Sequence, residues 1–214
     1  MEKDSKIIVF SGGCFSGKTT TMKALQTELI NKGYKVYILK EIIRDIINEP
    51  IDQLRNNPIK YFEVQKKIIT EKIKQEKQAF ELAKKQKNTI FLVDRAITDS
   101  LFYYENYVDK TNLPDKIIEE YCEFQEQIDK YAYEAFEYIY NAIVEFTPLN
   151  VTSNVDKFRP KNISKLKYYE YNVISRLNDY YYTKAKYKPI YLCGNLNKQT
   201  LDNIAKSMVN ALYL

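Results

Sequence analysis

The sequence predicts an α/β fold, in which a five-stranded parallel sheet carries helices on both faces. Short apolar, β-branched runs alternate with helical stretches along the chain, which is the order typical of parallel sheets. A glycine-rich loop joins the first of these runs to the first helical stretch. The 214 residues contain no internal repeat and no clear linker. We therefore expect one domain, residues 1–214, with a short lid at about residues 149–162.

Five short runs are the predicted strands. They lie at residues 6–11, 34–39, 89–93, 142–146 and 189–193. The runs at 6–11 and 89–93 are almost wholly apolar, as expected of strands covered on both faces. Ligands of such sheets bind beyond the carboxyl ends of the strands. Four residues lie at or just past the ends of predicted strands, where a ligand would bind. They are Glu41, Asp94, Pro148 and Gly194.

Helices are predicted between the strands. Gly33 ends the first helix, at a position where a left-handed conformation is favoured. Asn57-Pro58 opens a long amphipathic helix, and Asn162 can cap a later one. Residues 149–161 are polar, include Pro160 and predict a mobile loop, which is the expected lid. The predicted helices span residues 20–31, 41–48, 59–87, about 100 onward, a stretch ending near 138, 162–186 and 198–212.

Composition excludes several kinds of chemistry. The chain has no histidine, so a histidine base, a Ser-His triad and a histidine-ligated metal are all excluded. Its three cysteines are far apart and form no C-x-x-C pair, which argues against zinc and for a reducing compartment. The net charge of +5 is spread along helices, which fits an anionic substrate without indicating nucleic acid. No signal peptide or membrane-length apolar run is evident, so we expect a cytoplasmic protein.

Residues 12–19 fit the pattern G-x-x-x-x-G-K-[ST], which cradles nucleotide phosphates. Backbone amides and the helix N-terminus bind the anion, Lys18 reaches the β- and γ-phosphates, and the Thr19 hydroxyl binds Mg²⁺. The alternative is a glycine-rich turn that matches by chance. Cys14 is either a small filler or a reactive thiol. The predicted nucleotide-binding residues are Gly12, Gly13, Cys14, Phe15, Ser16, Gly17, Lys18, Thr19 and Thr20.

Acidic and basic residues after the strands are the candidate catalytic groups. Asp94 is suited to hold Mg²⁺ together with Thr19, although it could merely cap the next turn. Arg95 could contact phosphate or pair with Asp99 or Glu41. Glu41 is the leading candidate for a base acting on an attacking hydroxyl, with an exposed first-turn acid as the alternative.

Two further arginines are candidates for binding anionic groups. Arg44 lies one helical turn after Glu41 and could pair with it or bind an anionic acceptor. Arg159, in the predicted lid, could stabilise the transferring group or remain a solvated surface residue. The candidate catalytic set is therefore Lys18, Glu41, Asp94, Arg95 and Arg159.

Five segments occur in an order that resembles a known group. They are residues 12–19, Glu41-x-x-Arg44, Asp94-Arg95-x-x-x-Asp99, residues 140–148 and Asp156-x-x-Arg159. Together they are similar to the P-loop kinase-like ATPase domain of nicotinamide-riboside kinases and, more broadly, to the thymidylate kinase and deoxynucleoside kinase class. The resemblance implies a three-layer P-loop NTPase.

The resemblance also implies roles for individual residues. Asp94 and Arg95 would act at the reaction centre, Arg159 would act from the lid, and Glu41 would serve as the base. Phe62-x-x-Gln65 is similar to an element that reads the acceptor's base, although Phe62 also fits the core. Ala96 departs from thymidylate kinases, which usually have Tyr or Phe there, and the arginine-rich lid is reduced to Arg159. The substrate-binding candidates are Arg44, Phe62, Gln65 and Asp99.

These observations predict an ATP- and Mg²⁺-dependent phosphotransferase acting on a small nucleoside- or nucleotide-like hydroxyl. The alternative is a nucleotide-gated binding or regulatory NTPase with slow turnover, and a kinase of nucleic-acid ends has less support. The absence of an N-K-x-D motif in a suitable place favours ATP over GTP. A homodimer is possible through tyrosine-rich helices, whose rings more readily fit the core. These tyrosines are Tyr131, Tyr133, Tyr138, Tyr168, Tyr169 and Tyr171.

Overall fold

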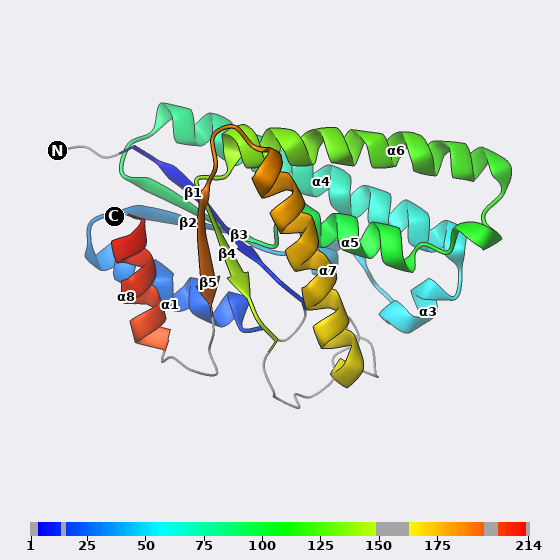
Figure 1. Ribbon diagram of the computed structural model, residues 1–214, viewed down its shortest axis with the longest axis horizontal. Helices are drawn as coiled ribbons and strands as arrows, with labels where there is room; N and C mark the ends of the chain where they lie inside the picture. The colour runs from blue at the N-terminus through cyan, green and yellow to red at the C-terminus, as the bar shows by residue number, and fades with distance from the viewer. Residues whose placement is uncertain (1–3, 14–15, 149–162, 195–200, 213–214) are drawn as a thin grey trace.

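The computed structural model describes residues 4–13, 16–148, 163–194 and 201–212. Its five strands form one parallel sheet in the order β2-β3-β1-β4-β5, as Figure 1 shows. The strands are β1 (Lys6–Ser11), β2 (Lys35–Leu39), β3 (Thr89–Asp94), β4 (Ala142–Phe146) and β5 (Ile190–Gly194). The predicted α/β class, strand number and parallel pairing are confirmed.

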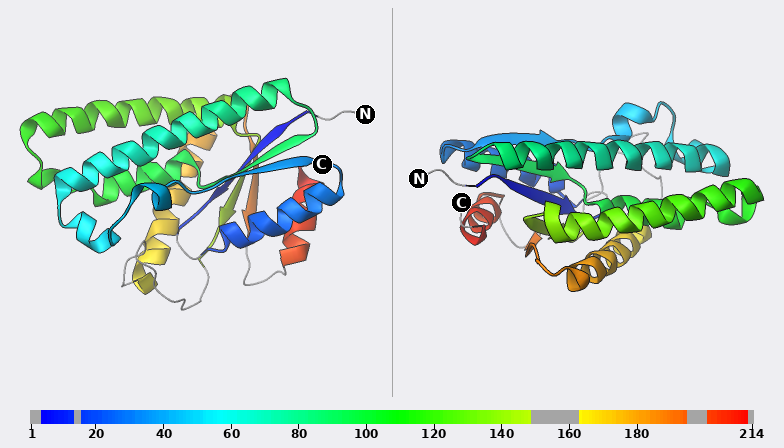
Figure 2. Two further views of the ribbon diagram at one scale, coloured as in Figure 1. Left: turned by 180° about the vertical axis from the view of Figure 1, so that it is seen from behind. Right: turned by 90° about the horizontal axis from the view of Figure 1, so that it is seen from above.

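Helices cover both faces of the sheet and make three layers (Figures 1 and 2). Successive side chains of a strand point to opposite faces. Ile7 and Val9 of β1 therefore join a buried cluster with α4, α5 and α6, while Ile8 and Phe10 join a second cluster with α1 and α8. The helices are α1 (Lys18–Asn31), α2 (Ile43–Ile46), α3 (Ile51–Arg55), α4 (Pro58–Lys85), α5 (Ile97–Tyr107), α6 (Asp115–Glu134), α7 (Ile163–Lys184) and α8 (Leu201–Ala211).

The segment between β2 and α4 differs from the prediction. The expected helix at 41–48 is reduced to the single turn of α2, and α3 was not predicted. Pro50 precedes α3 with a φ of −59°, which suits the start of a helix, and buried Ile51 and Leu54 hold the short helix against its neighbours. The Asn57 side chain then caps α4 by accepting a hydrogen bond from the Lys60 amide at 3.0 Å.

The helix predicted to end near residue 138 changes its winding before it ends. After α6 the chain continues as a π-helical turn, Ala135–Ile139, and the Tyr140 amide bonds to the Ala135 carbonyl at 2.8 Å. This wider turn points Tyr140 inward, where its hydroxyl donates to Glu76 and accepts from the Ile97 amide. The π turn thus ties α6 to the first residue of α5, near the candidate site.

Phe62 and one of the predicted core tyrosines lie in the buried core, whereas other tyrosines lie on the surface. Phe62 is fully buried and packs against Tyr104 and Tyr121 with ring centroids about 6 Å apart. Tyr131 is buried, as the core interpretation predicts. That interpretation is wrong for Tyr138, which is 61 % exposed, and for three others whose rings are also exposed. These are Tyr133, Tyr168 and Tyr169. Among the described helices, none is long and apolar enough to cross a membrane.

Candidate active site

The loop after β1 has the backbone of a phosphate cradle. Gly12 has a φ of +136°, and a Cβ on it would lie 2.7 Å from the Phe146 carbonyl oxygen, so only glycine fits. Gly17 has a φ of +87° and precedes α1. The Ser16 hydroxyl donates to the Gly13 carbonyl at 3.0 Å. Cys14 and Phe15 lie outside the described residues.

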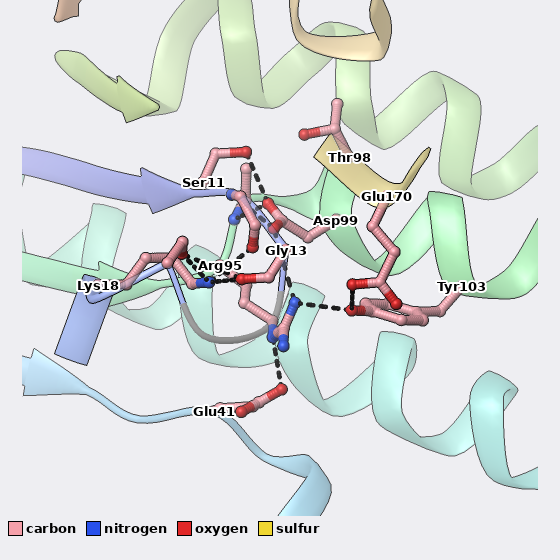
Figure 3. Close-up of polar contacts among 12 residues, drawn as sticks. Ser11, Gly13, Lys18, Glu41, Arg95, Thr98, Asp99, Tyr103 and Glu170 are labelled. Carbon is pink, nitrogen blue, oxygen red and sulfur yellow. Dashed lines mark hydrogen bonds and ion pairs between the residues drawn. The ribbon is translucent and has the colours of Figure 1, made fainter. Parts of the chain in front are cut away.

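The ammonium of Lys18 lies within this loop. Its Nζ donates to the Gly12 carbonyl at 2.6 Å and to the Gly13 carbonyl at 2.8 Å (Figure 3). The side chain is buried, so its charge is little screened by water. Thr20 is exposed in the first turn of α1. The fold thus presents a positive charge and a helix N-terminus to the same space, as phosphate binding requires.

Thr19 and Asp94 form a pair of oxygen ligands beside the loop. The Thr19 hydroxyl donates to Asp94 Oδ2 at 2.9 Å, and Asp94 lies at the end of β3, opposite Phe10 of β1. Mg²⁺ prefers oxygen ligands and commonly takes one or two from protein, with phosphates and waters completing the octahedron. No cluster of three acidic, histidine or cysteine side chains suited to a metal occurs among the described residues. The pair therefore fits a nucleotide-bound Mg²⁺.

Arg95 has an unusual backbone and bridges several elements. Its φ is +74°, rare for a residue with a side chain and often found at functional sites. Its amide continues the ladder by donating to the Phe10 carbonyl at 3.0 Å. Its guanidinium donates to Glu41 Oε1 at 2.5 Å and lies 3.7 Å from Asp99 Oδ1. Both ion pairs considered from the sequence are therefore present (Figure 3).

Glu41 follows the end of β2, and its carboxylate lies near the charges of Arg95 and Lys18. Burial by itself would raise the pKa of Glu41, but the charges of Arg95 and Lys18 outweigh it and hold that pKa below its usual value. Arg44 is exposed, and its charge also lowers the pKa of Glu41. Glu41 is consequently an ionised carboxylate near the phosphate cradle at neutral pH, able to accept a proton or a hydrogen bond.

Asp99 lies beneath the loop. Its carboxylate is fully buried and accepts hydrogen bonds from the Ser11 hydroxyl at 2.8 Å, the Gly12 amide at 2.9 Å and the Ala96 amide at 2.9 Å. Burial raises the pKa of Asp99 although Arg95 and Lys18 oppose that effect. This placement does not support direct contact with a substrate; Asp99 anchors the loop instead. The burial of Phe62 argues in the same way against its reading of an acceptor.

Sequence reasoning missed Glu170 of α7. This side chain is only 3 % exposed and accepts hydrogen bonds from the hydroxyls of Tyr103 and Tyr107 at 3.2 and 3.4 Å. A Cβ on Gly13 would lie 3.0 Å from Glu170 Oε2, so the carboxylate lies directly against the loop. The spacing of Asp99, Tyr103 and Tyr107 on one face of a helix was an available signal.

A second missed residue, Asn178, connects α7 to the base of the loop. Its side-chain amide donates to the Ser11 hydroxyl at 2.8 Å and to Glu145 at 3.1 Å, and its carbonyl accepts from Thr98 at 2.5 Å. These contacts join residues separated by 33 to 167 positions, so no local pattern in the sequence indicates them. Two residues of α7 thus hold this helix against the loop.

The predicted site residues therefore fall into four groups. The described residues of the loop, Glu41, Asp94 and Arg95 meet at the carboxyl ends of β1, β2 and β3, which are neighbours in the sheet. Phe62, Gln65 and Asp99 are buried, and Arg44 is exposed. Arg159 and the predicted lid at 149–162 lie outside the described residues.

Solved structures that resemble the whole chain include two kinases. Thymidylate kinase from Ehrlichia chaffeensis matches with a TM-score of 0.54 and 15 % identity, covering 99 % of this chain and 100 % of that one. Deoxyadenosine kinase from M. mycoides, determined with bound dATP, matches with a TM-score of 0.55 and 15 % identity, covering 98 % and 100 %. At these identities the likeness shows a common fold, that of a P-loop NTPase resembling nucleoside and nucleotide kinases.

Comparison with families extends this result. No curated protein matches the chain. The family model described as AAA domain matches residues 7–152, which include the phosphate loop, β1 to β4 and the candidate residues Glu41, Asp94 and Arg95. A P-loop domain of this kind implies nucleotide binding. Since the match covers more than half of the sequence, the chain belongs to the AAA domain family.

Proposed function

We propose that this protein is an ATP- and Mg²⁺-dependent phosphotransferase that acts on a small nucleoside- or nucleotide-like hydroxyl. The observation that carries the proposal is the meeting of Lys18, Glu41 and Arg95 at the ends of three adjacent strands. A loop for phosphate, a carboxylate for a hydroxyl and an arginine for developing charge are the parts that phosphoryl transfer needs. The similarity to two nucleoside and nucleotide kinases supports the same activity.

In this proposal each group has a separate task. Lys18 and the loop amides neutralise the phosphates, and Thr19 and Asp94 would hold Mg²⁺, which would supply further positive charge to offset that of the phosphates. Glu41 orients the acceptor hydroxyl and takes its proton. Arg95 stabilises charge on the transferring group while its pairing with Glu41 keeps both side chains in position. Arg159, in the lid predicted from the sequence, would add a further cation.

The fold by itself does not specify which compound accepts the phosphate. Members resembling nicotinamide-riboside kinases would accept a ribonucleoside, whereas thymidylate kinase-like activity would require a nucleoside monophosphate. We therefore include nicotinamide riboside, the common nucleosides and their monophosphates in one test panel. Arg44, exposed three residues after Glu41, is suited to contact an anionic acceptor, whereas Gln65 is buried like Phe62.

The decisive experiment measures acceptor-dependent ADP release from MgATP by the purified full chain. We expect one compound of the panel to accelerate ADP release and to yield a phosphorylated product detectable by mass spectrometry. Lys18→Ala should abolish both signals, while Lys23→Ala, at an exposed position of the same helix, should leave them unchanged. Absence of acceptor-dependent ADP release across the panel would contradict the proposal.

A second candidate is a nucleotide-gated regulatory NTPase with slow turnover. The match to the AAA domain family favours keeping it, because that description specifies no acceptor. It predicts tight nucleotide binding and hydrolysis that no small molecule accelerates. The same ADP-release assay separates the two functions, since only the kinase requires an acceptor for fast turnover.

A further inference from the structure

Arg55, at the end of α3, holds a half-buried positive charge without an acidic partner. No carboxylate of the described residues forms an ion pair with it, whereas Arg95 pairs with Glu41 and Lys72 with Glu76. Its Nε is buried and lacks a hydrogen-bond partner among the described residues. A buried charge without a partner is costly, so this position favours an anion.

Two aromatic rings hold the guanidinium in place. Its Cζ lies 3.7 Å from the centroid of the Tyr107 ring and 5.9 Å from that of Tyr61. Stacking and cation–π attraction stabilise the faces of the guanidinium. The N–H donors lie in its plane, however, and stacking itself supplies them no acceptor. Burial by itself would lower the pKa of Arg55, but the Tyr61 hydroxyl, buried beside the guanidinium, helps to raise it. The rings therefore orient Arg55, and its Nε is left without an acceptor among the described residues.

A row of stacked groups connects Arg55 to the candidate active site. Tyr107 stacks on Tyr103 with centroids 5.8 Å apart, and the Arg95 guanidinium lies 5.1 Å from the Tyr103 ring. Glu170 accepts from both tyrosine hydroxyls and fixes the two rings. Arg95 is at the reacting end of this row and Arg55 is at the other. Figure 1 shows α3 beside α4 and α5, on the side where the strands end.

We propose that Arg55 binds an oxyanion of the phosphate acceptor, either a phosphate or a carboxylate, at the end of the acceptor remote from the reacting hydroxyl. This inference rests on the proposed kinase function and narrows its substrate class to acceptors with a second, anionic group. Bidentate hydrogen bonding from a guanidinium held by aromatic rings is well suited to such a group.

Two matched pairs of compounds test the proposal with the full chain and MgATP. Adenosine is compared with adenosine 3′-monophosphate, which adds a phosphate, and uridine is compared with orotidine, which adds a carboxylate to the base. We expect the anionic member of one pair to have a KM about tenfold or more below that of its neutral partner. Arg55→Gln should remove this advantage with the KM for ATP unchanged, and Arg55→Lys should restore part of it.

Neutral members that perform as well as the anionic ones in both pairs, or an advantage that survives Arg55→Gln, would overturn the inference. If no compound accelerates ADP release, the kinase proposal is contradicted. The proposal for Arg55 is then tested by binding measurements alone. Calorimetry is then done on protein saturated with Mg²⁺ and a non-hydrolysable ATP analogue. Tighter binding of an anionic member, lost in Arg55→Gln, supports the subsite; equal binding, or none, overturns it. Tyr107→Leu, which removes the supporting ring, should weaken the same preference if Arg55→Gln folds poorly.

Discussion

The Glu41 carboxylate accepts a hydrogen bond from Arg95 Nε at 2.5 Å, joining the segment after β2 to the end of β3. The two residues are 54 positions apart in sequence, and adjacent strands bring them together. The pair places a carboxylate and a guanidinium beside the ammonium of Lys18 (Figure 3). Each charge therefore affects how the others bind protons and phosphate.

Glu41→Gln preserves the size of the side chain and removes its charge. If Glu41 takes the acceptor's proton, we expect kcat to fall about 10²-fold or more, with the KM for ATP changing little. Steady-state kinetics with the accepted compound measure both constants. Glu63→Gln, at an exposed position of α4, is the matched control and should behave like the wild type. An unchanged kcat would remove Glu41 from the mechanism.

The same pair predicts the pH dependence of stability. The pKa of Glu41 in the folded protein lies below the usual value of 4.5. The pairing therefore stabilises the fold fully above pH 4.5, and this contribution is lost as pH falls through the lower, folded-state pKa. We expect the difference in unfolding free energy between wild type and Glu41→Gln to be constant at neutral pH and to shrink in acid. Denaturant unfolding at several pH values measures it, and a difference that grew in acid would reverse the assigned sign.

Thr19 and Asp94 should act as one unit in Mg²⁺ binding. We expect Thr19→Val and Asp94→Asn each to weaken MgATP binding about tenfold, while ATP without Mg²⁺ binds as before. The double variant should be little worse than either single variant, because both changes disrupt the same ligand pair. Calorimetry with and without Mg²⁺ tests this, with exposed Thr27→Val as control. Equal losses without Mg²⁺ would show that the pair serves the loop instead of the metal.

Asp99 is expected to control stability and loop shape. Asp99→Ala leaves the Gly12 and Ala96 amides without their acceptor and removes a buried charge that faces Arg95. We expect a loss of about 3 kcal/mol or more in the free energy of unfolding, together with weaker nucleotide binding. Denaturant unfolding checks the first effect and calorimetry the second. Asp45→Ala, exposed on α2, should change the free energy of unfolding by less than about 0.5 kcal/mol.

A comparison of two glycines separates two costs of adding a side chain, the strain of a positive φ and the steric clash of the new Cβ with nearby atoms. Gly12 and Gly33 both have positive φ, but a Cβ on Gly33 would meet no atom within 4 Å, whereas one on Gly12 would lie 2.7 Å from backbone. We expect Gly33→Ala to cost about 1 kcal/mol, from conformation alone. Gly12→Ala should cost clearly more and should also disrupt nucleotide binding. Similar losses for the two variants, measured by thermal unfolding, would mean that the loop relaxes around the added carbon.

Local sequence patterns predicted an element correctly where neighbouring residues alone determine that element. The alternation of apolar runs identified all five strands, and Asn57-Pro58 identified the start of α4. Local patterns failed at α3, whose stability depends on burial of Ile51 and Leu54, and at the π turn after α6, which tertiary packing selects. They also failed for the exposed tyrosines, because periodicity does not specify which helical face another helix covers.

By itself the sequence determined the phosphate loop, the α/β class and the acids and arginines that follow strands, since each depends on neighbouring residues. Tertiary structure alone decided that Arg95 pairs with Glu41 and Asp99, that Asp99 lies beneath the loop, and that Glu170 and Asn178 of α7 support it. The order β2-β3-β1 decides the contact between Arg95 and Glu41. It places the ends of three strands side by side, and a linear pattern of residues does not specify which strands become neighbours.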